Sequence, residues 1–190
     1  PALTELNHDA FADPRVAVHA RDAMKFLEAH LDAGDAPYDA VIVDLPDPNG
    51  FALGKLYSRS FYRLLRANLS EHAVGVVQAT SPYYAPRAYW CVVRTLDAAN
   101  LHPRPYHAHV PSFGDWGFVL IRPSTAPEAT PLSLNEDLDY QSLSDEVLRS
   151  LFVFPADQPR LDVDVNRLDN QLLVHYYERD LSSPTPGARP

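Results

Sequence analysis

The sequence predicts an α/β fold, in which strands and helices alternate along the chain. Two apolar runs support this class: YDAVIVDL at 38–45 and VGVVQA at 74–79 show no alternation of polar residues. Such runs are typical of parallel strands that are covered on both faces. The stretches between them carry apolar residues at helical spacing, so the chain is expected to alternate between the two kinds of element.

The elements follow from local patterns. RVAVHA at 15–20 alternates apolar and polar residues and predicts a strand, and the helix after Asp22 is expected to end at Gly34. PDPNG and PSFGDW consist of residues that favour turns, and the second turn is short enough to join two antiparallel strands. In order, the expected elements are strand 15–20, helix 22–34, strand 38–45, helix 57–69, strand 74–79, helix 81–96, and strands 106–110 and 117–121.

The composition changes after Arg122. PSTAPEATP resembles a linker, Ser144 can cap a short helix, and a later helix would place Leu168, Leu172, His175 and Tyr176 on one face. We therefore expect three segments: an α/β core over 1–123, a linker with a helical C-terminal extension over 124–181, and a disordered tail over 182–190.

Composition excludes several classes of function. The 190 residues are 46% hydrophobic and 22% charged, as in ordinary globular proteins, and the net charge of −9 argues against nucleic acid or an anionic membrane as partner. The 7 glycines form neither GxGxxG nor GxxxxGK[ST], so a self-contained dinucleotide fingerprint or P-loop is absent from the sequence. A single cysteine excludes an intrachain disulfide framework, and no run of eighteen apolar residues indicates a membrane span.

Candidate site residues follow the apolar strands, because ligands of open α/β sheets bind at the carboxyl ends of strands. Asp44 ends the strand YDAVIVD, and Asp47 lies three residues on. The two carboxylates could bind an amine or a metal, or divide the roles of anchor and general base; alternatively, Asp47 caps the turn and Asp44 caps the following segment. Asp22 follows the first predicted strand and could accept hydrogen bonds from a base or ribose, or cap the next helix. Gln78, with its neighbours Thr80 and Ser81, could line the same cleft or form a turn.

Aromatic residues are frequent around these positions. Aromatic faces beside carboxylates suit an alkylammonium ligand, although most of these rings are expected to pack in the core. The residues concerned are Tyr57, Tyr83, Tyr84, Tyr89, Trp90, Phe113 and Trp116.

Other chemistries find little support. His102, His107 and His109 lack the spacing of a metal site, and alternation places His107 and His109 on one solvent-facing side of a strand. Cys91 lies within a predicted helix, away from its positive end, and no GxSxG motif marks a serine hydrolase. We expect no metal.

Several segments together resemble the polyamine aminopropyltransferases, the spermidine synthases. They are YDAVIVDLPDP, KLYSRSFYRLL, VVQATSPYYAPRAYWCVV, RPYHAHVPSFGDWGFVL and FVFPAD…VNRLDNQLLVHYY. The likeness runs from about Leu6 to Leu181 and is greatest to the bacterial branch that carries membrane segments upstream of its catalytic domain. It implies a methyltransferase-like Rossmann sheet and transfer of an aminopropyl group from decarboxylated S-adenosylmethionine, as co-substrate, to putrescine or a similar polyamine.

The resemblance also implies residue roles. The first Asp of DxxDP, here Asp44, deprotonates or orients the attacking amine, and the second, Asp47, holds the diamine. Asp22 and Ala23 bind the adenine, although many relatives have glycine at the second position. Tyr57, Gln78 and Phe113 complete the expected substrate-binding set. Phe51 stands where many relatives have a proline near the adenosine.

The resemblance places the glycine-rich donor loop outside these residues, so we expect this chain to be the C-terminal portion of the domain and incomplete on its own. In the family's strand order, 3-2-1-4-5-7-6, the strand at 15–20 is third and that at 38–45 is fourth, which leaves the former without a neighbour unless it rearranges or another chain fills the gap. We expect a cytoplasmic homo-oligomer, membrane-tethered if membrane segments lie upstream. The alternatives are an S-adenosylmethionine-dependent methyltransferase and a non-catalytic interaction domain.

Overall fold

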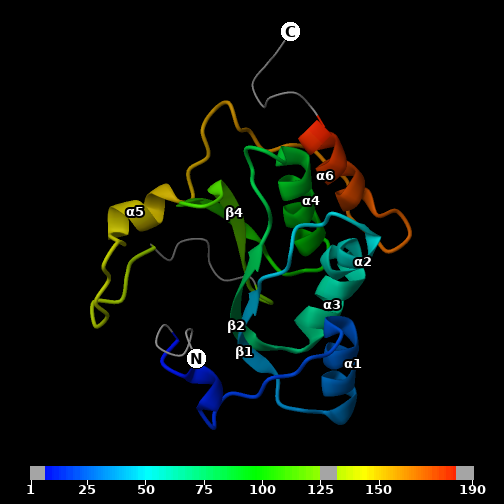
Figure 1. Ribbon diagram of the computed structural model, residues 1–190, viewed down its shortest axis with the longest axis vertical. Helices are drawn as coiled ribbons and strands as arrows, with labels where there is room; N and C mark the ends of the chain where they lie inside the picture. The colour runs from blue at the N-terminus through cyan, green and yellow to red at the C-terminus, as the bar shows by residue number, and fades with distance from the viewer. Residues whose placement is uncertain (1–6, 125–131, 183–190) are drawn as a thin grey trace.

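The computed structural model describes residues 7–124 and 132–182 (Figure 1). Helices and strands alternate through the first of these ranges, and two further helices follow in the second. In chain order the elements are η1 (Ala10–Ala12), α1 (Ala23–Ala33), β1 (Tyr38–Val43), α2 (Phe51–Gly54), η2 (Lys55–Tyr57), α3 (Arg59–Ala67), β2 (Leu69–Gln78), α4 (Pro86–Asp97), β3 (Arg104–Val110), β4 (Gly114–Ile121), α5 (Asp145–Ser150) and α6 (Leu172–Ser182).

The strands form one mixed sheet in the order β1-β2-β4-β3. β1 and β2 are parallel, whereas β4 runs antiparallel to both β2 and β3. The order 4-5-7-6 that the resemblance implies for the strands from residue 38 onward is therefore confirmed. β2 begins five residues earlier than the apolar run suggested, because Leu69 already pairs with Tyr38 across an irregularity in the register.

Local capping explains where the helices begin and end. Asp22 accepts a hydrogen bond from the backbone N–H of Lys25 at the start of α1, and Gly34 ends this helix at φ 68°, a left-handed conformation that favours glycine. Ser58 caps α3 by accepting from the N–H of Phe61. The helix predicted after Asp22, with its end at Gly34, is confirmed.

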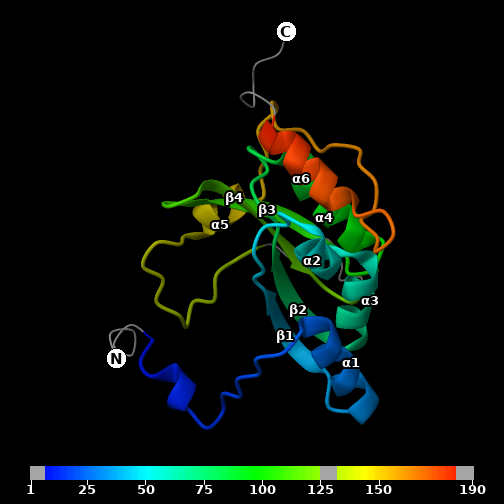
Figure 2. The same ribbon diagram turned by 45° about the vertical axis from the view of Figure 1, so that its right-hand side comes forward.

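The helices α1, α3, α4 and α6 lie together on one side of the sheet, and α5 lies on the other side beside β3 (Figure 2). The core fills the space between the sheet and α3 and α4, where Phe61, Tyr62 and Val92 meet Val77 and Val119. Burial of these side chains is the main source of stability.

The opposite face of the sheet is largely open at β1. Ile42 is 79% exposed and Val74 on β2 is 47% exposed, whereas Val43, which points to the helices, is buried. The prediction that the strand at 38–45 is covered on both faces is therefore wrong for the described part of the chain. Its apolar run reflects one packed face and one face that no described helix covers.

The predicted strand at 15–20 is also wrong. These residues form no strand, and Val16 and Val18 are exposed. β1 is an edge strand of the described sheet, and 15–20 does not pair with it. An alternating pattern stabilises a strand only where a neighbour accepts its backbone hydrogen bonds.

The segment after β4 packs across the helices. Ser144 caps α5 by accepting from the N–H of Val147, and Phe154 contacts the ring of Trp90 at a centroid distance of 5.3 Å. Asp180 of α6 caps α4, since its carboxylate accepts from the backbone N–H and the guanidinium of Arg87. The expected linker begins at 124, and its residues 125–131 lie outside the described residues. The expected disordered tail begins at 182, but Ser182 is the last residue of α6, and 183–190 lie outside the described residues.

Candidate functional site

The carboxyl ends of β1 and β2 bring the principal candidates together. β1 ends at Val43, the loop that follows carries Asp44 and Asp47, and β2 ends at Gln78. Gln78 donates a hydrogen bond from Nε2 to Asp47 Oδ1 at 3.3 Å. The parallel pairing of the two strands places these side chains at one edge of the sheet, as the sequence reasoning expected.

Tyr57 places its hydroxyl within hydrogen-bond distance of this loop and of Gln78. Its side chain is buried, and its hydroxyl lies 3.0 Å from the carbonyl of Pro46, 3.1 Å from that of Leu45 and 3.2 Å from Gln78 Oε1. Burial, with a smaller contribution from the negative charges of Asp47 and Asp44, raises the pKa of Tyr57 well above its usual value. The phenol therefore stays protonated and acts as a donor at the base of the loop.

Tyr177 is a residue that the sequence reasoning did not select. Its hydroxyl donates to Asp47 Oδ2 at 2.9 Å, from a helix 130 positions along the chain. Burial and this hydrogen bond raise the pKa of Tyr177 well above its usual value. Two signals in the sequence pointed to it: its place next to Tyr176, and its position at the end of VNRLDNQLLVHYY, one of the segments that carry the resemblance.

Asp44 and Asp47 differ in their surroundings. The side chain of Asp44 is exposed and makes no hydrogen bond to the described residues, whereas both oxygens of the half-buried Asp47 accept hydrogen bonds. An exposed carboxylate with unused lone pairs can accept a proton or a ligand N–H. The pair thus offers one fixed and one free carboxylate at the same loop.

Asp22 makes its contacts with α1 and η2, and the described contacts do not include the loop of Asp44 and Asp47. It caps α1, and its second oxygen accepts from Lys55 Nζ at 2.8 Å. This ion pair, more than the N-cap bond to Lys25, lowers the pKa of Asp22. The described contacts therefore show Asp22 as the cap of α1. Through Asp22, Lys55 also connects the start of α1, where Ala23 is the first residue, to the turn that carries Tyr57.

The residues after β2 form a turn. Ser81 donates from Oγ to the carbonyl of Asp115 at 2.6 Å and accepts from the N–H groups of Tyr83 and Tyr84. Thr80 adopts φ 62°, and its carbonyl accepts from Gly117, where a side chain would collide with the ring of Tyr89. Of the two expectations for Thr80 and Ser81, lining the cleft or forming a turn, the described contacts show the turn.

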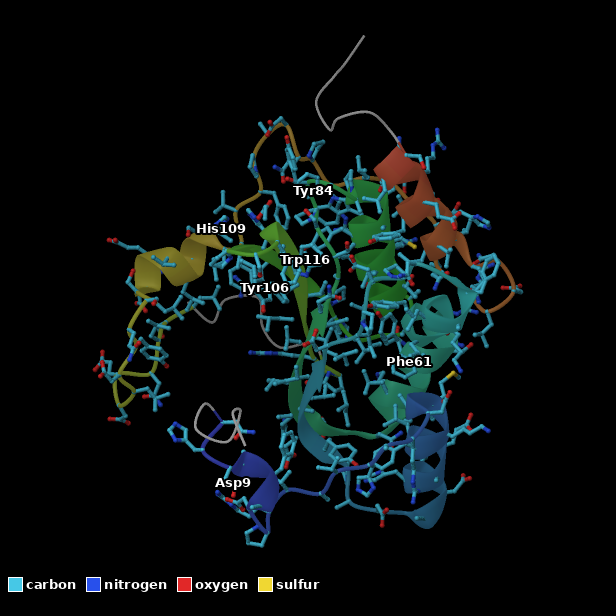
Figure 3. The ribbon with its side chains drawn as sticks, viewed as in Figure 1. Asp9, Phe61, Tyr84, Tyr106, His109 and Trp116 are labelled. Carbon is cyan, nitrogen blue, oxygen red and sulfur yellow. The ribbon has the colours of Figure 1, made fainter. Side chains whose placement is uncertain are left out.

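The aromatic candidates divide into two groups. Tyr89 and Trp90 are buried in the core, while Tyr84 and Phe113 are exposed at the end of the sheet where β3 turns into β4. Figure 3 shows Tyr84 and Trp116 near this turn and Phe61 among the helices. Phe113 is 60% exposed and packs on Trp116 at a centroid distance of 5.1 Å, so it presents an open aromatic face.

His107 is not solvent-facing, contrary to the expectation. It is partly buried, its Nδ1 lies 2.6 Å from Asp115 Oδ1, and its Nε2 donates to the carbonyl of Val153. The segment before Phe154 covers this face of β3, which the local pattern could not show. His109, two residues along the strand, is exposed as expected.

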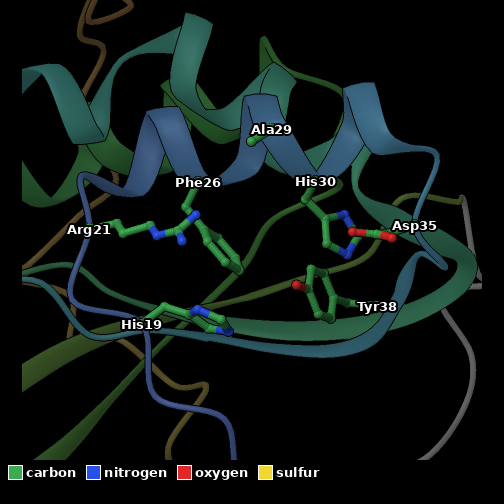
Figure 4. A pocket seen from close by; sticks show the side chains of 7 residues that line it. All are labelled: His19, Arg21, Phe26, Ala29, His30, Asp35 and Tyr38. Atoms are coloured by element: carbon green, nitrogen blue, oxygen red, sulfur yellow. The ribbon is translucent and has the colours of Figure 1, made fainter.

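The described residues offer neither a metal site nor a reactive thiol. Among residues 7–124 and 132–182, no group of three His, Cys, Asp or Glu side chains could hold a metal ion. Burial raises the pKa of Cys91 to about 12, which leaves its thiol unreactive. A hollow under α1 is lined by His19, Arg21, Phe26, Ala29, His30, Asp35 and Tyr38 and includes none of the candidate residues (Figure 4).

Comparison with known proteins identifies the family. Residues 2–132 match the model of the spermine/spermidine synthase domain. The chain belongs to the spermine/spermidine synthase family. It is 46% identical over 179 residues to polyamine aminopropyltransferase 2 of Ralstonia nicotianae, covering 94% of this chain and 34% of that protein. It is 39% identical over 180 residues to a polyamine aminopropyltransferase of Leptospira interrogans, again with 94% of this chain and 34% of that protein covered.

Solved structures of this family share the fold. The spermidine synthase of Thermotoga maritima matches with a TM-score of 0.65 at 18% identity, covering 80% of this chain and 51% of that chain. A spermidine synthase in complex with the transition-state analogue AdoDATO matches with a TM-score of 0.67 at 19% identity, over 81% and 53% of the two chains. The chain spans about a third of the length of the curated relatives it matches. No described helix is long and apolar enough to cross a membrane.

Proposed function

We propose that the protein transfers an aminopropyl group from decarboxylated S-adenosylmethionine to putrescine, and that this chain supplies the amine-binding part of the site. The observation that carries the proposal is the pair Asp44 and Asp47 at the end of β1. One carboxylate is fixed by two hydrogen bonds and the other is free. The relatives named polyamine aminopropyltransferases share this region of the chain.

The chemistry requires both carboxylates. A diamine has reference pKa values near about 10, so its nitrogens are mostly protonated at neutral pH and are not nucleophilic in that form. Asp44 accepts the proton from the attacking nitrogen, and Asp47 holds the ammonium at the other end of the diamine. The division matches their surroundings, because a base needs free lone pairs and an anchor needs a fixed position.

The transfer step balances without a metal. The nitrogen lone pair forms a bond to the methylene carbon next to the sulfonium, and the carbon–sulfur bond breaks with its electron pair going to sulfur. The donor leaves as neutral methylthioadenosine, and the product nitrogen keeps its two remaining protons as a secondary ammonium, so Asp44 takes only the one proton that the attacking ammonium loses before the bond forms. No residue has to activate the leaving group, so positioning and proton transfer are what the protein supplies.

The remaining candidates receive supporting roles in this proposal. Tyr57 and Gln78 support Asp47 and the loop, and the exposed ring of Phe113 suits the methylenes of the diamine. Asp22 and Ala23 would face the adenine of the donor. Because no glycine-rich loop occurs in the sequence, we propose that the donor is also held by polypeptide beyond these residues.

The test is Asp44→Asn in the full-length protein. Turnover of decarboxylated S-adenosylmethionine and putrescine to spermidine and methylthioadenosine should fall by about 10²–10⁴-fold, the usual contribution of a general base. Asp39→Asn is the matched control, because Asp39 lies near the start of β1, at the end opposite to Asp44, where it accepts from Ser70. Undiminished turnover in Asp44→Asn refutes the assignment, and methyl transfer from S-adenosylmethionine itself would favour a methyltransferase.

A further inference from the structure

The helix α6 reaches the loop that carries the two carboxylates. Figures 1 and 2 show α6 lying along α4, with its first turns next to α2. Two contacts connect it to the loop and to α2: Tyr177 donates to Asp47 Oδ2 at 2.9 Å, and the ring of His175 meets that of Phe51 edge-on at 6.2 Å. The helix lies outside residues 2–132, the range matched by the family model.

Asp47 is held from two sides by neutral donors. Gln78 occupies Oδ1, and the amide oxygen of Gln78 in turn lies 3.2 Å from the hydroxyl of Tyr57. Tyr177 occupies Oδ2. An ionised carboxylate can accept about four hydrogen bonds, so both oxygens keep capacity for a ligand. Tyrosine and glutamine fix the orientation of the group without cancelling its charge, which suits the capture of an ammonium.

The support of Tyr177 is itself fixed. Asn166, which is fully buried, donates from Nδ2 to the carbonyls of Gly54 and Tyr57 and accepts at Oδ1 from the N–H of Leu173. One side chain therefore ties the start of α6 to the turn that carries Tyr57. At the other end of the helix, Asp180 is anchored to α4. The phenol of Tyr177 is thus presented from a rigid element, as a positioning group requires.

We propose that Tyr177 is a positioning residue for the amine acceptor, which it serves by orienting Asp47 toward the distal ammonium. The inference rests on the proposed function, in which Asp47 is the anchor. The C-terminal helix is then a part of the acceptor site as well as a cover for the core. Loss of the hydroxyl should affect binding of the amine and leave the chemical step and the donor unaffected.

The test is Tyr177→Phe in the full-length enzyme. The KM for putrescine should rise about tenfold, the effect of losing one hydrogen bond to a charged group. The kcat should change by less than about twofold, because saturating amine restores the occupied state, and the KM for the donor should stay unchanged. Tyr176→Phe is the matched control: its hydroxyl lies 3.5 Å from the N–H of Asp164 and makes no hydrogen bond to the acceptor loop.

A second variant separates the two proposals. Asp47→Asn should raise the KM for putrescine, and adding Tyr177→Phe to it should have little further effect, since the interaction is already lost. An unchanged KM in Asp47→Asn would refute Asp47 as anchor and the role of Tyr177 with it. A raised KM in Asp47→Asn together with an unchanged KM in Tyr177→Phe would refute the role of Tyr177 alone. Equal losses in Tyr176→Phe and Tyr177→Phe would show a structural effect and overturn the inference.

Discussion

The acceptor end of the sheet and the N-terminal segment at 7–21 contain similar kinds of residue but differ in how their polar groups are satisfied. At the acceptor end, Tyr57, Gln78, Asp47 and Tyr177 form one connected set of hydrogen bonds. In the N-terminal segment the polar contacts are local, such as that between Arg15 and Asp13, two residues apart.

The difference shows what turns a pattern into structure. Val16 and Val18 have the alternation of a strand but remain exposed, whereas Val77 on β2 is fully buried between two paired neighbours. Burial against helices and pairing with strands on both sides stabilise β2 around Val77. The described residues around Val16 and Val18 provide neither. Changes at the acceptor end should therefore be costly, and changes in the N-terminal segment should not.

The largest expected effect is alkaline unfolding. Burial raises the pKa values of Tyr57, Tyr62, Tyr89 and Tyr177 in the folded protein, while in the unfolded chain they titrate near about 10. A folded pKa above the unfolded one gives stability that is fully present below pH ~10 and is lost as the pH rises toward the folded value. The protein should unfold cooperatively above pH ~10.

Circular dichroism and phenolate absorbance, followed together, check this prediction. The two signals should change at the same pH for the buried tyrosines, because these phenols ionise only when the chain unfolds. Tyr62→Phe should shift the transition to higher pH, because the buried hydroxyl of Tyr62 has no hydrogen-bond partner among the described residues and its loss removes only the ionisable group. Ionisation of all 10 tyrosines while the circular dichroism of the folded state persists would contradict the prediction.

The next effect is that of Asn166→Ala. Removal of this side chain leaves the carbonyls of Gly54 and Tyr57 and the N–H of Leu173 buried without partners. At about 1 kcal/mol or more for each group, the free energy of unfolding should fall by about 3 kcal/mol in denaturant titrations. Arg15→Ala in the N-terminal segment removes only an exposed ion pair and should cost less than about 0.5 kcal/mol. Similar losses in the two variants would remove the contrast between the regions.

Local and topological rules could predict much of this molecule. Gly34 as a helix end follows from its lack of a side chain, and Ser144 as a cap follows from its hydroxyl. The rule that ligands bind at the carboxyl ends of parallel strands selected Asp44, Asp47 and Gln78, and the structure places the last two in contact. These features depend on residues close in sequence or on one known strand pairing.

The features that escaped prediction depend on distant partners. The hydrogen bond between Tyr177 and Asp47 joins residues 130 positions apart, and His107 is covered by the segment around Val153, 46 positions further along the chain. Residues 15–20 form a strand only if a neighbouring strand pairs with them, and the pattern within the segment does not show whether one is present. Side-chain pattern alone therefore identifies elements better than it identifies their partners.

The smallest expected effect concerns the open face of β1, where two adjacent residues provide a matched comparison. Ile42 is 79% exposed and Val43 is 8% exposed, on opposite faces of one strand. Val43→Thr buries a hydroxyl among apolar side chains and should cost about 1–2 kcal/mol, whereas Ile42→Thr should stay within about 0.5 kcal/mol. Denaturant midpoints of the two variants of this chain measure the difference. If Ile42→Thr costs as much as Val43→Thr, another polypeptide surface covers this face of β1. The difference between well-supported and open regions of the molecule would then not extend to this strand.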